Sequence, residues 1–311
     1  MNRKLLSIVT PCFNEEGNVE ELHREIAAAL DQFPQYDWEH IYIDNASSDG
    51  TQAILRRMAS AEPRIKVILN TRNFGHIRSP FHAMFQARGD AVITLSADLQ
   101  DPPSLIPQFI EKWEAGCKVA LGQKITSDES PLFFTIRTAY YRLVRRLADI
   151  ELIEHVTGFG LYDREVIEQF RKINDPYPYC RGLVSDLGYE VARIQYHQPN
   201  RKSGITHNNF YTLYDMAMLG ITSHSKVPLR VATLLGFALS LCSMFLAICY
   251  FIYKLLFWNR FPVGQAPVVI GLFLFSSVQL FFTGVLGEYI AAIHTQVLHR
   301  PLVIEKERLN F

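Results

Sequence analysis

The sequence predicts an α/β protein with a mainly parallel sheet, followed by a C-terminal hairpin of two transmembrane helices. Short apolar runs alternate with helical patterns over the first 120 or so of its 311 residues. Such alternation is typical of βαβ units and a parallel sheet. After residue 227 the composition changes, and two long stretches carry no charged residue.

The elements of the sheet domain can be placed in order along the chain. Strands are expected at Leu5–Thr10, His40–Asp44, Ile65–Leu69, Ala91–Leu95 and Lys118–Gly122. The patterns between them predict helices at Val19–Leu30, Thr51–Ala59, His76–Ala87 and Leu105–Glu114. We therefore expect the strands to lie side by side, with the helices packed on the faces of the sheet.

The uncharged stretches are Val231–Tyr253 and Ala266–Gly287, and each exceeds the roughly 20 residues needed to cross a bilayer core. Buried helices of a soluble protein would instead show amphipathic patterning. Basic residues flank the hairpin at Lys226, Arg230, Arg300, Lys306 and Arg308, which favours a cytoplasmic location for both ends. Lys254 and Arg260 in the connecting loop count against this orientation. The aromatic segment Asn208–Gly220 is interpreted as a helix in the membrane interface.

Charge and cysteine content narrow the class of protein. The 31 basic and 31 acidic residues balance, so the composition gives no indication of a nucleic-acid partner. The five cysteines show neither metal-ligand spacing nor a paired framework, which fits a reducing compartment.

Polar motifs follow three of the expected strands. They are Pro11–Glu16, Asp44–Thr51 and Ser96–Pro103. Ligands of open α/β sheets bind beyond the carboxyl ends of the strands, where Asp44 can accept a hydrogen bond from a ribose or base. Asp98 can hold a divalent metal against a diphosphate. Taken singly, Asn14, Ser48 and Asp49 are equally well explained as helix N-caps.

At these motifs the chain resembles a known family. The resemblance rests on Pro11–Glu16, Asp44, Asp49–Thr51, Arg72–Gly75, Ala97–Pro103, Leu161–Arg164, Arg201–Gly204, Gly287–Tyr289 and Arg300–Pro301. Their order and spacing are similar to family 2 glycosyltransferases of the GT-A (Rossmann-like) fold. More narrowly, they resemble the polyprenyl-phosphate glycosyltransferases, which include bactoprenol glucosyltransferases and dolichol-phosphate mannose synthases. The resemblance covers nearly the whole chain.

The resemblance implies a role for individual residues. It implies nucleotide binding by Pro11, Phe13, Glu15, Asp44, Arg72 and Asp98. It assigns Asp98 and Gln100 to a divalent cation, Mg²⁺ or Mn²⁺, and implies catalytic roles for Asp98, Arg201 and Lys202. For the acceptor phosphate we expect Arg137, Arg201, Lys202 and His207. Arg137 and its neighbours Arg142, Arg145 and Arg146 are equally consistent with a basic face turned to solvent or lipid headgroups.

Three positions depart from the family pattern. Ser96 stands where the acidic motif often begins with aspartate, and His207 stands where lysine is usual, so a permanent charge becomes titratable. Gly158 stands where many members carry the first residue of an Asp-Phe-Arg-Leu stretch, so no general base is assigned there. A lipid phosphate has a second pKa of about 6 and already carries an anionic oxygen at neutral pH, so a strong base is not required.

The resemblance implies inverting transfer of a hexose from a nucleotide-diphosphate sugar, UDP-glucose or UDP-N-acetylglucosamine, to undecaprenyl phosphate. We expect a multi-pass protein of the inner membrane, and a tetramer as for some relatives. Residues 1–206 would form the cytoplasmic GT-A domain, 207–226 an interfacial helix and linker, 227–293 the transmembrane helices and 294–311 a cytoplasmic tail. Two alternatives remain: a non-catalytic nucleotide-sugar sensor, and a processive polysaccharide synthase. The synthase would be expected to show a Gln-x-x-Arg-Trp motif and more membrane helices.

Overall fold

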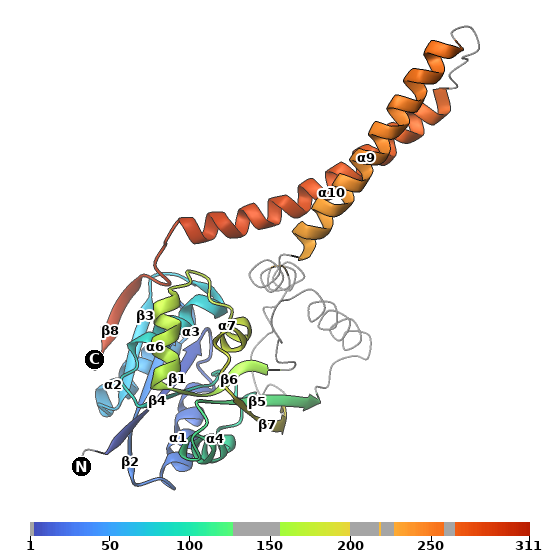
Figure 1. The fold of residues 1–311 in the computed structure, drawn as a ribbon. Helices are drawn as coiled ribbons and strands as arrows, with labels where there is room; N and C mark the ends of the chain where they lie inside the picture. The colour runs from blue at the N-terminus through green and yellow to red at the C-terminus, as the bar shows by residue number, and fades with distance from the viewer. Residues whose placement is uncertain (1–2, 127–155, 200–217, 219–226, 258–264) are drawn as a thin grey trace.

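The computed structural model describes residues 3–126, 156–199, 218, 227–257 and 265–311. Within these residues the chain forms an eight-stranded sheet in the order β7-β5-β6-β4-β1-β2-β3-β8 (Figure 1). The strands are β1 (Lys4–Cys12), β2 (Tyr36–Asp44), β3 (Ile65–Asn70), β4 (Ala91–Thr94), β5 (Val119–Thr126), β6 (Val156–Asp163), β7 (Val191–His197) and β8 (Glu305–Leu309). The expected mainly parallel sheet is confirmed, and the structure adds antiparallel pairs that make it mixed.

The central strands place the predicted motifs at one edge of the sheet, the edge formed by the carboxyl ends of the parallel strands. β1 pairs in parallel with both β2 and β4, and β2 pairs in parallel with β3. In this register Cys12 lies beside Asp44, and Asp44 lies beside Leu69. The segments that follow β1, β2, β3 and β4 therefore leave the sheet at the same edge.

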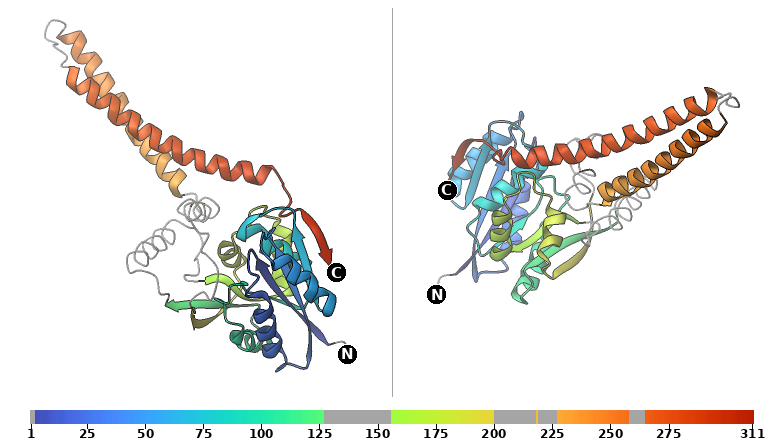
Figure 2. Two further views of the ribbon diagram at one scale, coloured as in Figure 1. Left: turned by 180° about the vertical axis from the view of Figure 1, so that it is seen from behind. Right: turned by 45° about the horizontal axis from the view of Figure 1, so that its top comes forward.

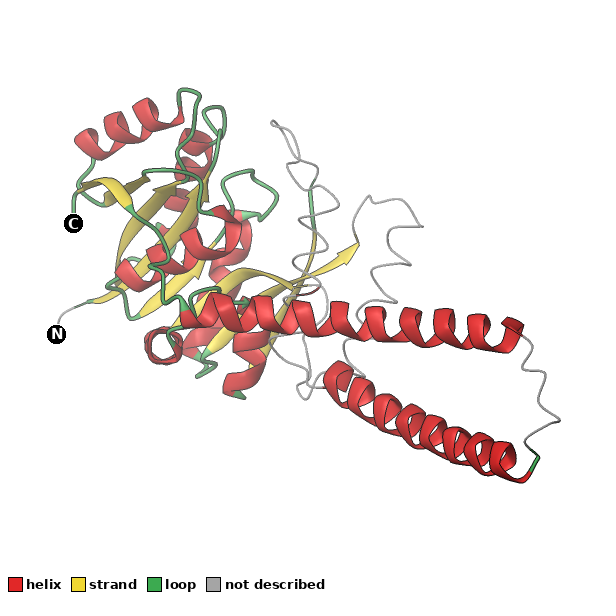
Figure 3. Ribbon diagram, turned by 90° about the horizontal axis from the view of Figure 1, so that it is seen from above, coloured by secondary structure: helices red, strands yellow, loops and turns green. Residues whose placement is uncertain are grey.

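Helices cover both faces of the sheet (Figures 1 and 3). They are α1 (Val19–Leu30), α2 (Thr51–Ala61), α3 (Gly75–Gln86), α4 (Ile106–Glu114), α6 (Arg164–Ile173) and α7 (Cys180–Leu187), with a short 3₁₀ turn, η1 (Pro103–Leu105), before α4. Successive strand side chains alternate between the faces: Leu6 and Ile8 of β1 join the core beneath α1, α2 and α4, whereas Val9 joins the core beneath α3, α6 and α7.

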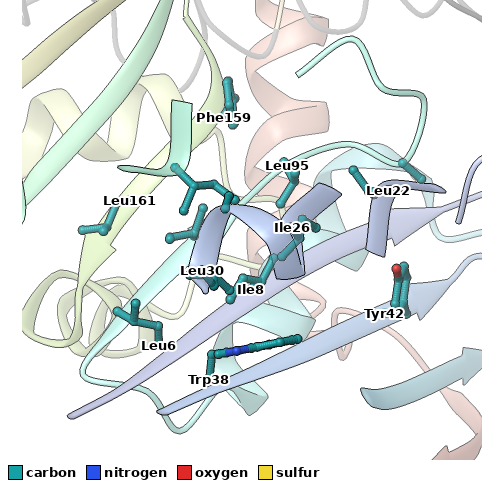
Figure 4. Close-up of a cluster of buried hydrophobic side chains, with 14 of the residues drawn as sticks. Leu6, Ile8, Leu22, Ile26, Leu30, Trp38, Tyr42, Leu95, Phe159 and Leu161 are labelled. Atoms are coloured by element: carbon teal, nitrogen blue, oxygen red, sulfur yellow. The ribbon is translucent and has the colours of Figure 1, made fainter. Parts of the chain in front are cut away.

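Figure 4 shows the first of these cores, in which Leu22, Ile26 and Leu30 of α1 lie over β1 and β2. These three residues recur at helical spacing and are almost fully buried. Burial of such side chains contributes roughly 1.5–3 kcal/mol each to folding. The α1 range matches the expected helix at both ends.

Three strands were not predicted from the sequence. β6 runs antiparallel between β4 and β5, and β7 pairs in parallel with β5 at one edge. β8 lies in residues 294–311, which were expected to form a tail, and it pairs antiparallel with β3 at the other edge. Its sequence, Glu-Lys-Glu-Arg-Leu, lacks the apolar run of a central strand because an edge strand needs few apolar residues and is often charged.

Two long apolar helices follow the sheet domain, as predicted. They are α9 (Val227–Leu256) and α10 (Gln265–Val297), which run side by side in Figures 1 and 2. In the described residues, Val227–Leu246 and Leu274–Val297 are long and apolar enough to cross a membrane, with mean hydropathies of 1.9 and 1.3. Apart from the buried Tyr289, their side chains are exposed or partly buried. With 33 residues, α10 is about 50 Å long, more than the roughly 30 Å of a bilayer core.

Candidate active site

The loops that follow β1 and β2 are joined by hydrogen bonds. The Asn14 backbone N–H donates to Ser47 Oγ at 2.9 Å, and the Ser48 N–H donates to Asn14 Oδ1 at 2.8 Å. Asn14 has φ 57°, a left-handed conformation that asparagine tolerates. Asn14 and Ser48 thus connect two loops and do not cap a helix.

A second set of bonds joins Glu15 and Glu16 to the start of α2. The Glu15 N–H donates to Thr51 Oγ1 at 2.9 Å, and Glu16 Oε2 accepts the Gly50 N–H at 2.6 Å. Asp49 accepts the backbone N–H groups of Glu16 and Thr51. Burial raises the pKa of the Asp49 carboxyl, but its hydrogen bonds with Thr51 and Glu16 outweigh burial and leave the pKa below its ordinary value.

The buried Asp44 ends β2 at the centre of this loop pair. Its carboxylate accepts hydrogen bonds from the Ser47 N–H at 3.0 Å, from the Ser47 hydroxyl, and from Gln52 Nε2 at 2.9 Å. These bonds fix the orientation of the carboxylate. Pro11 and Phe13, the other expected nucleotide-binding residues of this edge, are both partly exposed beside it.

The segment after β3 is held by two asparagines. Asn70 Nδ2 donates to Asn45 Oδ1 and to Ser79 Oγ, each at 3.0 Å, and Asn45 Nδ2 donates to the Gly75 carbonyl at 3.2 Å. Arg72, an expected nucleotide-binding residue, is exposed, and its guanidinium lies 4.0 Å from the centre of the Phe74 ring. This stacking keeps the charge at the sheet edge.

The acidic loop follows β4. Asp98 is 8% exposed, and its Oδ1 accepts the Gln100 N–H at 3.2 Å. Between them Leu99 has φ 59°, a left-handed conformation that costs a leucine about 1–2 kcal/mol. Asp101 Oδ2 accepts both the N–H and the hydroxyl of Ser96, and Asp101 Oδ1 accepts the Tyr196 hydroxyl at 3.2 Å. Burial raises the pKa of the Asp101 carboxyl, although the bonds from Ser96 oppose the rise.

Asp98 and Gln100 supply the kind of donor that Mg²⁺ or Mn²⁺ takes, because hard cations prefer oxygen ligands. In the described residues no three His, Cys, Asp or Glu side chains are grouped to hold a metal. Both oxygens of Asp101 already accept hydrogen bonds from the protein. Magnesium is commonly held by one or two carboxylates together with substrate phosphates, so this donor set fits a cation that a bound diphosphate completes.

Gly158 lies in β6, which pairs with β4, the strand that precedes the acidic loop. Its φ is 98°, and its carbonyl accepts the Thr94 hydroxyl at 2.5 Å and the Tyr162 hydroxyl at 2.8 Å. A Cβ here would lie 3.6 Å from Cys180 Sγ. The positive φ, which glycine adopts at no steric cost, accounts for glycine at this position.

The structure thus brings Pro11, Phe13, Glu15, Asp44, Arg72, Asp98 and Gln100 to one edge of the sheet. Arg137, Arg201, Lys202 and His207 lie outside the described residues, as do Arg142, Arg145, Arg146 and all of Asn208–Gly220 except Met218. Sequence reasoning missed Ser47, Gln52 and Tyr196, which position the acidic side chains. Only Ser47 lies inside a motif that the sequence singled out.

Comparison with known proteins covers both sequence and fold. The family model of glycosyl transferase family 2 matches residues 7–171. The chain is 34% identical over 300 residues to the uncharacterized glycosyltransferase YkcC of Bacillus subtilis (strain 168), covering 96% of this chain and 92% of the relative. It is 33% identical over 303 residues to the bactoprenol glucosyl transferase of Shigella phage SfV, covering 97% and 98%.

A solved structure with a similar fold is glucosyl-3-phosphoglycerate synthase from Mycobacterium tuberculosis in complex with Mn²⁺, uridine diphosphate and phosphoglyceric acid. Its TM-score is 0.51 at 19% identity, over 70% of this chain and 76% of that one. The likeness supports the GT-A-like architecture of the sheet domain.

Proposed function

Because the chain belongs to glycosyl transferase family 2, we propose that it transfers a hexose from a nucleotide-diphosphate sugar to a polyprenyl phosphate in the membrane. One observation carries this proposal: Asp44 and Asp98 lie at the same edge of the sheet, and the same chain continues into two long apolar helices. The sheet edge suits a nucleotide sugar, and the helices suit a lipid acceptor. The chain is similar to bactoprenol glucosyl transferases over nearly its full length.

The proposed donor is UDP-glucose, with UDP-N-acetylglucosamine as the second candidate. The printed names of the similar phage proteins favour glucose, and the solved structure with a similar fold contains uridine diphosphate. Asp44 and the Asn14–Ser47 loop pair would hold the base and ribose, because the carboxylate and backbone groups there can pair with hydroxyl and amide donors. The proposed acceptor is undecaprenyl phosphate.

Asp98 and Gln100 would hold Mg²⁺ or Mn²⁺ against the diphosphate of the donor. When bound, such a cation stabilises the negative charge that develops on the leaving nucleoside diphosphate. Arg201 and Lys202, and with them Arg137 and His207, are proposed to bind the acceptor phosphate. These cations would bring two anionic reactants together, which is the main requirement of the reaction.

We propose direct displacement with inversion at the anomeric carbon, in which an oxygen of the lipid phosphate attacks and the nucleoside diphosphate leaves. That oxygen is already anionic at neutral pH, so the carboxylate missing at Gly158 is not needed as a base. The basic flanks Arg230, Arg300, Lys306 and Arg308 favour a cytoplasmic location for the sheet domain, where nucleotide sugars are available.

The test is transfer of labelled sugar from a panel of nucleotide sugars into organic-extractable lipid, with purified protein, undecaprenyl phosphate and divalent cation. We expect label from one uridine-diphosphate donor and its loss on adding a chelator. Nucleotide-sugar binding without label from any donor would support the sensor alternative. Formation of a polymer would support the polysaccharide synthase.

The first variant to assay is Asp98→Asn, which keeps the size of the side chain and removes its charge. We expect transfer to fall at least about 100-fold, because loss of a group that stabilises developing charge typically costs this much. Asp90→Asn is the matched control: Asp90 is exposed before β4, where its carboxylate accepts the Leu5 N–H at 2.8 Å. Full activity in Asp98→Asn would refute the site assignment.

A further inference from the structure

Asp101 is a buried carboxylate in the acidic loop that takes no direct part in the reaction proposed above. It is 6% exposed, and hydrogen bonds from β7 and from the beginning of its own loop reach its two oxygens. Oδ2 accepts the N–H and the hydroxyl of Ser96, and Oδ1 accepts the Tyr196 hydroxyl. A buried carboxylate requires such partners, because an unpaired one is costly.

The position of Tyr196 is itself tightly constrained. The side chain is 5% exposed, and its ring packs edge-on against Phe159 with centroids 5.6 Å apart. A Cβ on Gly122 of the neighbouring strand would lie 3.0 Å from Tyr196 Cε1 and 2.8 Å from Phe159 Cδ1. Because Gly122 has no side chain, the rings of Tyr196 and Phe159 can occupy this space. The phenol is closely packed and has little freedom to move away from Asp101.

The loop between Ser96 and Asp101 needs an anchor of this kind. Leu99 adopts φ 59°, which is unfavourable for a branched side chain, and it separates the two expected cation ligands Asp98 and Gln100. Such a conformation persists only where the surrounding structure determines it. The bonds from Ser96 to Asp101 connect the two ends of the loop around Leu99. The bond from the Tyr196 hydroxyl then attaches Asp101, and with it the end of the loop, to β7.

We propose that Tyr196 is a positioning residue for donor binding: through Asp101 and Ser96 it holds the acidic loop in the conformation that presents Asp98 and Gln100. The hydroxyl at Ser96 has a defined part in this arrangement, because it donates a hydrogen bond to Asp101. The inference rests on the proposed function, since it concerns the donor site of that reaction.

The experiment compares Tyr196→Phe with the matched control Tyr36→Phe in the full-length protein. Tyr36 also donates its hydroxyl to a carboxylate, Glu114 Oε1, at 2.6 Å. Tyr36 begins β2, so this bond lies near the amino ends of the parallel strands, away from the candidate site. The first readout is hydrogen exchange of the peptide that covers residues 96–101, without any ligand. The second is binding of UDP in the presence of Mn²⁺, and the third is KM and kcat for the lipid transfer reaction.

We expect Tyr196→Phe to speed exchange in residues 96–101, to weaken UDP–Mn²⁺ binding about tenfold, and to raise KM for the donor more than it lowers kcat. Tyr36→Phe should leave all three unchanged. Ser96→Ala should act in the same direction. Because both side chains act through Asp101, the effects of Ser96→Ala and Tyr196→Phe on binding should not add in the double variant.

Wild-type exchange and wild-type binding of UDP–Mn²⁺ in Tyr196→Phe would overturn the inference. Additive effects in the double variant would also contradict it, because they would mean that the two hydroxyls act independently. If the wild-type protein binds UDP–Mn²⁺ but transfers no sugar to lipid, the proposed function fails, while the exchange and binding data still test the positioning role.

Discussion

A buried histidine, His40 of β2, and a partly buried one, His23 of α1, lie on the face of the sheet that α1 and α2 cover. His40 Nε2 lies 2.9 Å from Thr10 Oγ1, His40 Nδ1 lies 3.0 Å from His23 Nδ1, and His23 Nε2 lies 3.3 Å from Glu62 Oε2. In the contact between the two Nδ1 atoms, one nitrogen must donate and the other accept. Burial lowers the pKa of His40 well below its ordinary value and, despite the opposing effect of Glu62, lowers that of His23.

These depressed pKa values predict how stability depends on pH. In the unfolded chain the histidines bind a proton near pH 6.5, whereas the folded protein resists protonation until a lower pH. The unfolded state therefore binds more protons below about pH 6.5, and the free energy of unfolding should fall there by up to about 1.4 kcal/mol per pH unit for each group. Thermal unfolding between pH 5.5 and 8 measures this change.

The variant His40→Gln should be less stable than wild type at pH 8 but should lose less stability on acidification. His197→Gln, at an exposed position on β7, should keep the wild-type slope. An unchanged slope in His40→Gln would show that the pH dependence arises elsewhere.

At the level of single residues, the sequence predicted which side chains lie at the site. It did not predict most of the hydrogen bonds that hold them there. Asp44 and Asp98 were identified because Asp44 ends one apolar strand and Asp98 lies in the motif that follows another, and parallel strands have their carboxyl ends on the same side of the sheet. Tyr196 was not identified, because its contact with Asp101 spans 95 residues and depends on the pairing of β7 with β5. A sequence pattern within one strand or helix gives no indication of such a long-range contact.

Among the elements, β8 has the most distant partner in sequence. Its register with β3 places Leu309 beside Val67 and Glu307 beside Leu69. Asn310 Nδ2 donates to the carbonyls of Ala59 and Ile65 at 2.7 and 2.8 Å. Just before the strand, the Ile304 carbonyl accepts the Thr71 N–H at 3.0 Å, one residue before Arg72. The C-terminal strand thus supports the segment that carries an expected nucleotide-binding residue.

Deletion of residues 305–311 should therefore destabilise the sheet domain. We expect a loss of about 3 kcal/mol or more, because the ladder to β3 and both Asn310 bonds disappear, and each bond contributes about 1 kcal/mol. Glu307→Gln is the control: it removes only the charge that pairs with the partly exposed Arg56, and it should cost no more than about 1 kcal/mol. Thermal unfolding of the detergent-purified proteins, with hydrogen exchange in β3, distinguishes the two. Equal stability of deletion and wild type would contradict a structural role for β8.

The predictable elements of the fold were those with a local signal. The α1 and α2 helices begin where the sequence placed them, and the central strands agree within a few residues, because their apolar runs and helical spacing are strong. β6 could not be predicted in the same way: it contains Gly158 and Gly160, which weaken any strand pattern. At Gly160 a Cβ would lie 2.2 Å from the Ala120 carbonyl oxygen, so the close approach of β5 requires glycine.

For the whole molecule, the joining of the apolar helices to the sheet domain limits how the chain can sit in a membrane. A short segment, residues 298–304, connects α10 to β8 (Figure 2). Gln296 Nε2 near the end of α10 donates to Asp175 Oδ1 at 2.9 Å. The end of α10 and the sheet must therefore lie on the same side of the bilayer. The loop between α9 and α10 would lie on the opposite side.

Cysteine labelling tests this orientation in inverted and right-side-out vesicles. The partly exposed Cys117 and Cys180 and the exposed Cys242 and Cys249 are first replaced by serine. A cysteine at Lys306→Cys, exposed on β8, should react with a membrane-impermeant reagent only when the cytoplasmic face is accessible. One at Arg260→Cys, in the connecting loop, should react only from the other face. Labelling of both from the same face would refute the hairpin topology.

The pairing of β3 with β8 also sets an order of events during synthesis. About 235 residues separate Asn70 from Glu305, and at roughly 5–20 residues per second a ribosome needs about 12–47 s to make them. Throughout this interval the side of β3 that faces away from β2 has no partner strand. The strand that completes the sheet is therefore made only after both apolar helices, the segments proposed to anchor the chain beside a lipid acceptor, have been synthesised.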